Sequence, residues 1–289
     1  MPFTLSHAAA VLPAVRRTGR ARGPLVASAL VLGSFAPDTF FFADAVLPGP
    51  LMSYGTFTHS LLGVATADAV LTAVLAACWL LLREPLTALL PRGLRGRVYA
   101  FVRGEDWRGR ARPALALWFY LSAVAGSLTH VVWDSFTHHD RWGTDAVPEL
   151  GRTAAFGLPL YSLLQYGTSA MAACALVWFA VSALRRLPAT PAPPSVPVLR
   201  PAQVWGALAL LGVCVAVGVT VRVVRFFTFF EEIRTPFDII PTVCFGAGGG
   251  FVVGLLLYGV LVRLLHRPGR DRRDRHHPDQ ETRTPVPTA

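Results

Sequence analysis

Charged residues are scarce in this sequence. Only 15% of the 289 residues are charged, whereas 53% are hydrophobic, and the mean hydropathy is +0.47. A soluble domain of this length needs more polar residues to cover its surface. The composition therefore excludes an ordinary soluble enzyme and predicts a protein embedded in a membrane.

Lysine is absent, so all 27 basic residues are arginine, and there are only four cysteines. A formal net charge of +10 can indicate nucleic-acid binding, but these arginines cluster beside apolar runs, as the positive-inside rule describes. We therefore expect membrane lipids as partners and no nucleic acid. No Cys-x-x-Cys pair occurs, which argues against a thiolate zinc site or a disulfide framework.

Long apolar runs, by contrast, are plentiful. Six of them have about the 20 residues that a helix needs to cross a bilayer: 24–47, 57–82, 114–136, 158–184, 204–227 and 241–265. A shorter stretch, 3–15, predicts a re-entrant or interfacial helix. The predicted fold is an all-α, polytopic integral membrane bundle of about six transmembrane helices plus this short N-terminal helix.

The connections between these runs alternate in charge. The segments 16–22, 83–112 and 185–200 and the chain after Arg263 are rich in arginine, whereas 48–56 is uncharged, 137–157 is mixed and 231–238 is acidic. Because arginine-rich connections stay in the cytoplasm, we predict a cytoplasmic C-terminus and an outward-facing connection after residue 136.

Proline density divides the chain. The stretch 185–201 predicts an extended cytoplasmic linker between a motif-bearing membrane domain, 1–184, and a two-helix membrane hairpin, 202–266. The remaining residues, 267–289, mix charge and proline without apolar periodicity and predict a disordered basic tail. Any chemistry is expected in the first part, which holds five of the eight histidines.

Several ionisable residues lie within or beside the apolar runs, where each costs a few kcal/mol to insert. His130, Asp134 and His138 are spaced i, i+4 and i+8, so they drift only about 80° around a helix and share one face. Asp38 and His59 lie near the same outer face in the predicted topology. The sequence thus predicts one polar cluster, and imidazoles with carboxylates are usual ligands of divalent metals.

Structural explanations for these residues remain open. Asp134 can simply hydrogen-bond His130, and His138 can be solvated at the helix end. His7 reaches the cluster only if the N-terminal stretch dips to mid-depth, and a capping role there is an equal alternative. Pro37 should break the first run and free backbone groups, and Asp68 is expected to pair within the bundle rather than to bind metal.

Five segments follow one another over about the first 170 residues: MPFTLSHAAAVLP, SFAPD, THSLLG, GSLTHVVWDSFTH and LPLYSLLQYG. As a set they resemble the bacterial membrane family named domain-of-unknown-function 4184, with no resemblance after Leu184. Members of that family often have a histidine after the glutamine of the last segment, where this chain has Tyr166. The resemblance implies the plasma membrane of a bacterium as the location.

The order of polar residues is also similar to that of predicted membrane-bound metal-dependent hydrolases. This resemblance implies a divalent metal, with zinc the first choice and manganese or iron as alternatives. The implied metal-site residues are His7, Asp38, His59, His130 and Asp134.

The leading hypothesis is a metal-dependent hydrolase that acts near the outer membrane face on a phosphate ester or lipid-derived substrate. A bound metal would activate water, and His138 would serve as acid or base. One alternative is a non-catalytic assembly or regulatory protein in which the polar cluster is structural. A second alternative is a proton or metal-ion transporter, which predicts polar residues at several depths.

Overall fold

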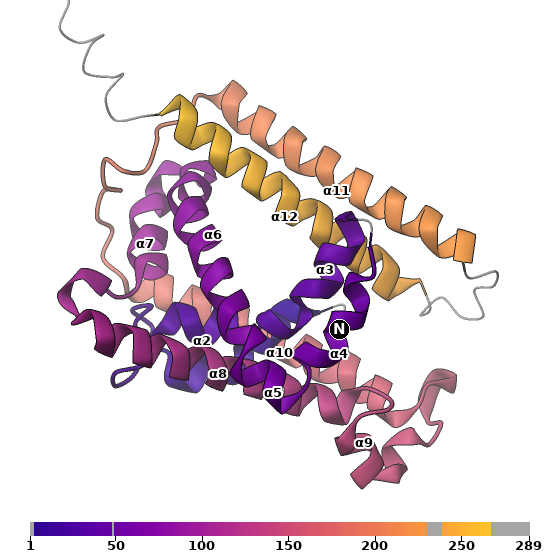
Figure 1. Cartoon of the computed structure of the whole chain (residues 1–289). Helices are drawn as coiled ribbons and strands as arrows, with labels where there is room; N and C mark the ends of the chain where they lie inside the picture. Colours follow the sequence, from indigo (N-terminus) through magenta and orange to yellow (C-terminus); the bar gives the residue numbers. More distant parts are fainter. Residues whose placement is uncertain (1–2, 48, 230–238, 267–289) are drawn as a thin grey trace, which may run out of the picture.

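The computed structural model describes residues 3–47, 49–229 and 239–266 (Figure 1). Within these residues the chain is helical, with two isolated β-bridges and no strand. Five of the described helices are long and apolar enough to cross a membrane: α6 (Ala67–Leu89), α8 (Arg112–Thr137), α10 (Leu160–Arg186), α11 (Pro201–Phe229) and α12 (Ile240–Leu265). The predicted all-α membrane bundle is confirmed.

The sixth candidate span is bent. Helices α2 (Ala27–Gly33) and α3 (Thr39–Val46) are joined through the 3-10 turn η3 (Ala36–Asp38), and the two parts of the span meet at 42°. Proline lacks an N–H group and its ring clashes with the carbonyl four residues earlier, so Pro37 breaks the helix, as predicted. The break places Asp38 at the centre of the bundle.

The second span begins later than the hydropathy predicts. Residues before it form two short helices, α4 (Tyr54–Thr58) and α5 (Leu61–Ala65), and α6 runs seven residues past the predicted end at Leu82. Ser60 caps α5 by accepting a hydrogen bond of 3.0 Å from the Gly63 N–H. His59 therefore lies in a turn rather than at the start of the span, because short apolar helices have the same hydropathy as a spanning helix.

The N-terminal stretch forms three short helical pieces, η1 (Thr4–His7), α1 (Ala8–Val11) and η2 (Leu12–Ala14). These pieces contact α2, α8 and α10, and His7 and Val11 are buried. The chain then returns to the arginine-rich side of the bundle, where the Ala21 N–H donates to Glu105 Oε1. The short N-terminal helix is thus inserted into the bundle, as the re-entrant form of the prediction requires.

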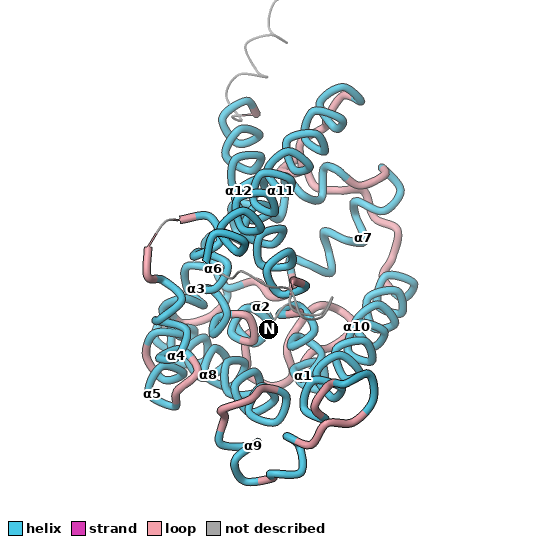
Figure 2. Tube along the Cα trace, turned by 90° about the vertical axis from the view of Figure 1, so that its right-hand side faces the viewer, coloured by secondary structure: helices cyan, strands magenta, loops and turns pink. Residues whose placement is uncertain are grey.

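Helices α11 and α12 run side by side along the bundle and pack against α6 and α3 (Figures 1 and 2). Pro85 interrupts the hydrogen bonding of α6, so the Leu81 carbonyl has no helical donor. Arg263 of α12 supplies one, with its Nε 3.0 Å from the Leu81 oxygen. Tyr258 also donates its hydroxyl to the Pro85 carbonyl at 2.8 Å. Side chains of α12 therefore donate hydrogen bonds to backbone carbonyls of α6, including one that the helix itself leaves unpaired.

The segment between α10 and α11 is not helical, and it is partly buried. Val196 and Leu199 pack with Ala88 of α6 and with Tyr258 and Val262 of α12. The division of the chain at 185–201 stays a prediction. The expected acidic connection at 231–238 and the expected disordered tail at 267–289 lie outside the described residues.

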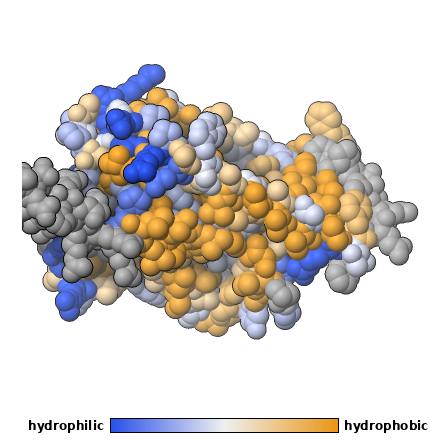
Figure 3. All heavy atoms as spheres, turned by 90° about the horizontal axis from the view of Figure 1, so that it is seen from above, coloured by the Kyte–Doolittle hydropathy of each residue, from blue (hydrophilic) through white to orange (hydrophobic). Residues whose placement is uncertain are grey.

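Large apolar side chains cover the outside of the long helices. Examples are Val177 of α10, Val217 of α11 and Leu257 of α12, each more than half exposed. Figure 3 shows a broad apolar area over the face formed by α11 and α12, with most hydrophilic residues at the left end and a smaller hydrophilic patch toward the right. An apolar face of this extent is stable against lipid and unstable against water, which fits a membrane protein.

Candidate metal centre

Four buried side chains meet inside the bundle. Asp38, His59, His130 and Asp134 each offer one ligand atom, and these four atoms all lie within 4.8 Å of one another. Asp38 comes from η3, His59 from the turn between α4 and α5, and the other two residues from successive turns of α8. The structure therefore brings together four residues that are separated by up to 96 positions in the sequence.

The spacing of these atoms resembles that of ligands around a metal. His130 Nε2 lies 3.5 Å from Asp38 Oδ1 and 3.4 Å from Asp134 Oδ2, and His59 Nε2 lies 3.6 Å from each of the same two oxygens. Ordinary N–H···O hydrogen bonds span about 2.7–3.2 Å. Donor atoms bound tetrahedrally at about 2.0–2.2 Å from zinc are about 3.3–3.6 Å apart. The measured distances match the second range.

Both imidazoles turn Nε2 toward the carboxylates. His130 Nδ1 is 2.7 Å from the Ser34 carbonyl oxygen and His59 Nδ1 is 2.8 Å from the Gly55 carbonyl oxygen, so each Nδ1 carries the proton and donates it. In the neutral form of each ring, the lone pair is then on Nε2, the atom that faces Asp38 and Asp134. Among the described residues, His130 Nε2 and Asp134 Oδ1 make no hydrogen bond. These contacts are stabilised by a positive charge between the nitrogen and oxygen atoms, either a metal ion or a proton on Nε2.

Close contact between α2 and α8 sets the position of the Ser34 carbonyl. A Cβ added to Gly126 would lie 2.2 Å from the Leu30 carbonyl oxygen, so only glycine allows the two backbones to approach so closely. One residue later, Ser127 donates its hydroxyl to the Gly33 carbonyl at 2.9 Å. Because the helix breaks at Pro37, the Gly33 and Ser34 carbonyls have no helical donor. Ser127 and His130 of α8 donate hydrogen bonds to them instead.

Two threonines hold the turn that carries Asp38. Thr4 donates its hydroxyl to Asp38 Oδ2 from the N-terminal segment. Thr58 donates to the Pro37 carbonyl at 2.8 Å. Asp38 is thus oriented by side chains from two other parts of the chain, which leaves its second oxygen, Oδ1, toward His59 and His130.

His7 lies directly beside the four residues but is not one of the compact set. Its ring stacks on His130 with centroids 3.7 Å apart, and its Nε2 is 3.3 Å from Asp134 Oδ1. The alternative capping role is not observed, since Ser6 donates its hydroxyl to the Phe3 carbonyl and η1 has no side-chain cap. Burial, followed by the neighbouring His130, lowers the pKa of His7 to about 3, so its ring is neutral.

His138 lies at the end of α8 on the same face as His130 and Asp134, as predicted. Its side chain is 26% exposed, and its Nδ1 lies 3.6 Å from Asp134 Oδ2. The Gln165 amide nitrogen is 3.1 Å from His138 Nε2 and donates to it. Burial lowers the pKa of His138, and Asp134 offsets this only in part, so the imidazole is neutral. The ring is oriented between the buried cluster and water, while its role as acid or base stays a prediction.

The electric field of the cluster attracts cations. At His59, burial opposes the charged form, but the carboxylates of Asp134 and Asp38 outweigh burial and raise the pKa above its usual value. The same field favours a metal ion bound between the carboxylates. The buried Asp/His/His/Asp cluster, with two nitrogen and two oxygen donors, can therefore bind a metal ion.

Asp68 is a further buried acid near this end of the bundle. It lies in the first turn of α6 and is fully buried, and neither of its carboxylate oxygens has a hydrogen bond among the described residues. The pairing expected from the sequence is thus not observed. Asp68 is also not a member of the compact group of ligand atoms.

A small pocket opens at the cluster. It has a volume of about 180 Å³ and lies between α8, His59 and the start of α9 (Trp142–Ala146); its lining residues are His59, Val131, Asp134, Ser135, Asp140, Arg141 and Trp142. Sequence reasoning did not single out Arg141, because an arginine in a polar loop is usually solvated. Its importance depends on where α9 folds back against α8.

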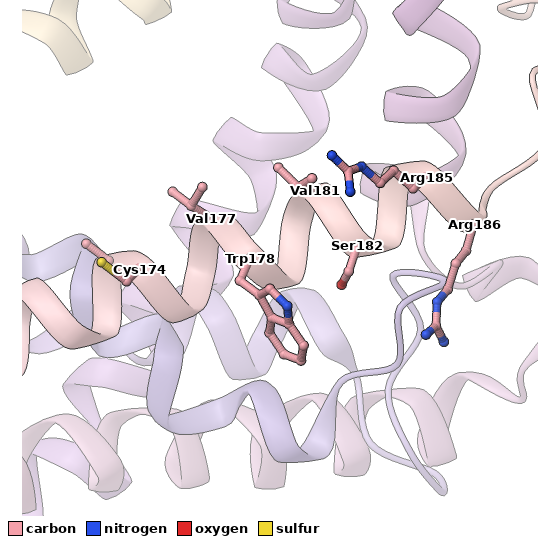
Figure 4. A pocket seen from close by; sticks show the side chains of 8 residues that line it. Cys174, Val177, Trp178, Val181, Ser182, Arg185 and Arg186 are labelled. Carbon is pink, nitrogen blue, oxygen red and sulfur yellow. The ribbon is translucent and has the colours of Figure 1, made fainter.

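A larger hollow of about 640 Å³ lies elsewhere, along the outer face of α10. Figure 4 shows Cys174, Val177, Trp178 and Val181 along this helix, with Arg185 and Arg186 at its end. Every residue that lines it belongs to α10, and none belongs to the cluster. This hollow is a lipid-facing groove and not the candidate site.

A family model matches residues 1–260 of the chain. The chain belongs to the DUF4184 family, a domain of unknown function. The match corrects the limit set at Leu184 above, because all of α11 and most of α12 also belong to the DUF4184 domain. No curated protein and no solved structure matches this DUF4184 chain.

Proposed function

We propose that this protein is a membrane-bound metal-dependent hydrolase that acts near the outer membrane face on a phosphate ester or lipid-derived substrate. The observation that carries the proposal is the buried set of two imidazoles and two carboxylates at metal-ligand spacing, next to a pocket. Asp38, His59, His130 and Asp134 would hold the metal, with zinc the first choice and manganese or iron as alternatives.

A bound divalent ion supplies a Lewis acid and lowers the pKa of water. The protein's own residues supply the rest. Asp38 and Asp134 provide negative charge, and the carbonyls of Ser34 and Gly55 fix the tautomers of His130 and His59. His138 accepts a proton at Nε2, the atom that now accepts a hydrogen bond from Gln165, and it lies close enough to water to release that proton.

A transport path would require unpaired ionisable groups at several depths. Outside the cluster, two buried acids of the spans are paired: Asp44 Oδ2 lies 2.6 Å from Arg222 Nη1, and Glu84 Oε2 lies 2.5 Å from Arg263 Nη2. Asp68 lies at the same end of the bundle as the cluster. This distribution favours one site over a path through the membrane.

The test begins with metal content. Detergent-purified wild type should carry close to one zinc, manganese or iron ion per chain by elemental mass spectrometry, and His130→Ala and Asp134→Ala should lose it. His266→Ala and Asp145→Ala are matched controls outside the cluster and should keep the metal. Folding of each variant is checked by circular dichroism and size-exclusion chromatography.

Hydrolysis is then assayed on phosphodiesters, phosphomonoesters and phospholipids in detergent and in nanodiscs. We expect turnover that a chelator abolishes, that added metal restores, and that His138→Ala reduces by about 10²–10⁴-fold without loss of metal. Well-folded wild type that binds no metal even after reconstitution would contradict the proposal and favour a structural role for the cluster.

A further inference from the structure

The pocket beside the cluster is lined by one arginine, Arg141. No ion pair joins Arg141 to a carboxylate in the part of the chain that the structure describes. The neighbouring Asp140 also lines the pocket, but its Oδ2 lies 2.7 Å from His139 Nδ1. The guanidinium of Arg141 is therefore available to a ligand that enters the pocket.

The fold fixes the place of Arg141 in the pocket. Asp140 adopts a left-handed backbone conformation with φ of 56°, which reverses the chain after α8. A Cβ added to Gly143 would lie 2.5 Å from the Ser135 carbonyl oxygen, so α9 lies directly on α8. Thr144 closes the turn by donating to the Arg141 carbonyl at 2.8 Å. Arg141 is thus presented by a constrained turn and not by an open loop.

The charge balance of the site shows what Arg141 can do, and this step rests on the proposed function. A divalent ion bound by Asp38 and Asp134 is neutralised by their two carboxylates. An anionic substrate then meets little net attraction from the metal centre. Of the other side chains that line the pocket, Asp140 is anionic and Arg141 is cationic, so Arg141 is the positively charged group left there to contact an anion. The planar guanidinium donates two parallel hydrogen bonds to a phosphate group, which suits it for this task.

Pocket size and surroundings narrow the ligand further. Pockets that enclose drug-sized molecules have volumes of about 300–1,000 Å³, so the 180 Å³ here holds a headgroup and not a whole lipid. Trp142 at its rim is 56% exposed, with its ring 5.2 Å from that of Phe136. Phe156, in the same connection between α8 and α10, is 86% exposed. Tryptophan is enriched at the level of the lipid headgroups, so Trp142 places the rim of the pocket at that level.

The geometry points to Arg141 as the residue that recognises the phosphate group of an amphiphilic phosphate ester, whose apolar part stays in the bilayer beside Trp142. The phosphate enters the pocket between Arg141 and the cluster. Arg141 is a specificity-determining residue and not a metal ligand.

The test measures ligand binding and not turnover. Isothermal titration calorimetry on detergent-purified, zinc-loaded protein follows binding of inorganic phosphate and of a short-chain phosphatidic acid. The variants are Arg141→Gln, Arg141→Lys and, as a matched control in the same connection, Arg152→Gln, which replaces an exposed arginine. Zinc content is measured on every sample by elemental mass spectrometry.

We expect wild type to bind both ligands, with the phosphatidic acid bound more tightly. Arg141→Gln should weaken both at least tenfold, Arg141→Lys should give an intermediate loss, and Arg152→Gln should stay within twofold of wild type. Zinc content should be equal in all four proteins, because Arg141 does not hold the metal.

Four results would overturn the inference. Zinc-loaded wild type that binds neither ligand, or an Arg141→Gln protein that binds both normally, refutes recognition by Arg141 while the metal centre stands. Equal affinity for inorganic phosphate and phosphatidic acid refutes the amphiphile and leaves a water-soluble phosphate ester. Wild type that takes up no zinc refutes the proposed function together with this inference.

Discussion

Replacing Gly126 with alanine should weaken metal binding by about 10–100-fold without changing any ligand. The added Cβ would lie 2.2 Å from the Leu30 carbonyl oxygen and 2.9 Å from the Ser34 nitrogen, so α2 and α8 must separate by about 1 Å to relieve the contact. His130 Nδ1 now lies 2.7 Å from the Ser34 oxygen, and the same separation stretches this distance to about 3.7 Å, beyond a hydrogen bond. His130 then loses the partner that fixes its tautomer.

The size of the effect follows from this lost hydrogen bond. Removing the hydrogen-bond partner of a ligating histidine typically costs 10–100-fold in metal affinity. At a metal concentration 1,000 times the wild-type Kd, binding stabilises the fold by about 4.1 kcal/mol, and a 100-fold weaker site leaves about 1.4 kcal/mol. Forcing the extra methyl group into the contact costs a further 1–3 kcal/mol or so in the metal-free protein.

The assay is zinc competition against a chromophoric chelator, with thermal unfolding followed at each zinc concentration. Gly167→Ala is the matched control, because this glycine of α10 has open space around its Cβ position. Ser127→Ala is a milder variant of the same contact, since it removes only the 2.9 Å hydrogen bond to the Gly33 carbonyl. A folded Gly126→Ala protein with wild-type zinc affinity would refute the argument that this backbone contact positions His130.

Three further predictions concern residues outside the ligand set. Asp68→Asn should keep the metal and leave the thermal midpoint of unfolding unchanged or higher, because it removes an ionisable group that is buried without a hydrogen bond. Loss of metal in elemental mass spectrometry would instead place Asp68 in the site. Arg222→Leu should destabilise the protein by about 3–5 kcal/mol in denaturant titrations, because it leaves the buried Asp44 without its ion pair. The double variant Asp44→Asn with Arg222→Leu should recover part of this loss. Equal stability of the single and double variants would contradict the prediction. Gly151→Cys in intact cells should react with a membrane-impermeant thiol reagent, and Gly109→Cys should react only after permeabilisation; the reverse pattern would invert the predicted topology.

The spans were predictable because membrane insertion depends on the hydropathy of consecutive residues, which can be read along the sequence. A run of apolar residues of sufficient length must form a helix in lipid, whatever it packs against. Both boundaries of the second span were misplaced. Its start was predicted too early because short helices precede α6 and share its hydropathy, and α6 also continues past the predicted end at Leu82. The bend at Pro37 was also predictable, since it follows from the covalent structure of proline.

The candidate ligands were predictable in part. His130 and Asp134 share a helix face by their spacing, and the cost of burying ionisable groups made Asp38 and His59 conspicuous. The supporting contacts were not predictable, because two of them are backbone carbonyls, those of Ser34 and Gly55, which every residue possesses.

The sequence by itself determined that this protein is a helical membrane bundle and that a small set of histidines and aspartates needs an explanation within it. Only the tertiary structure decided that four of them converge at metal-ligand distances, that His7 stacks beside them and that Arg141 lines the pocket. The physical reason is that hydropathy and helical periodicity act along the chain, whereas ligand geometry depends on close contacts between distant segments, such as Gly126 against Leu30.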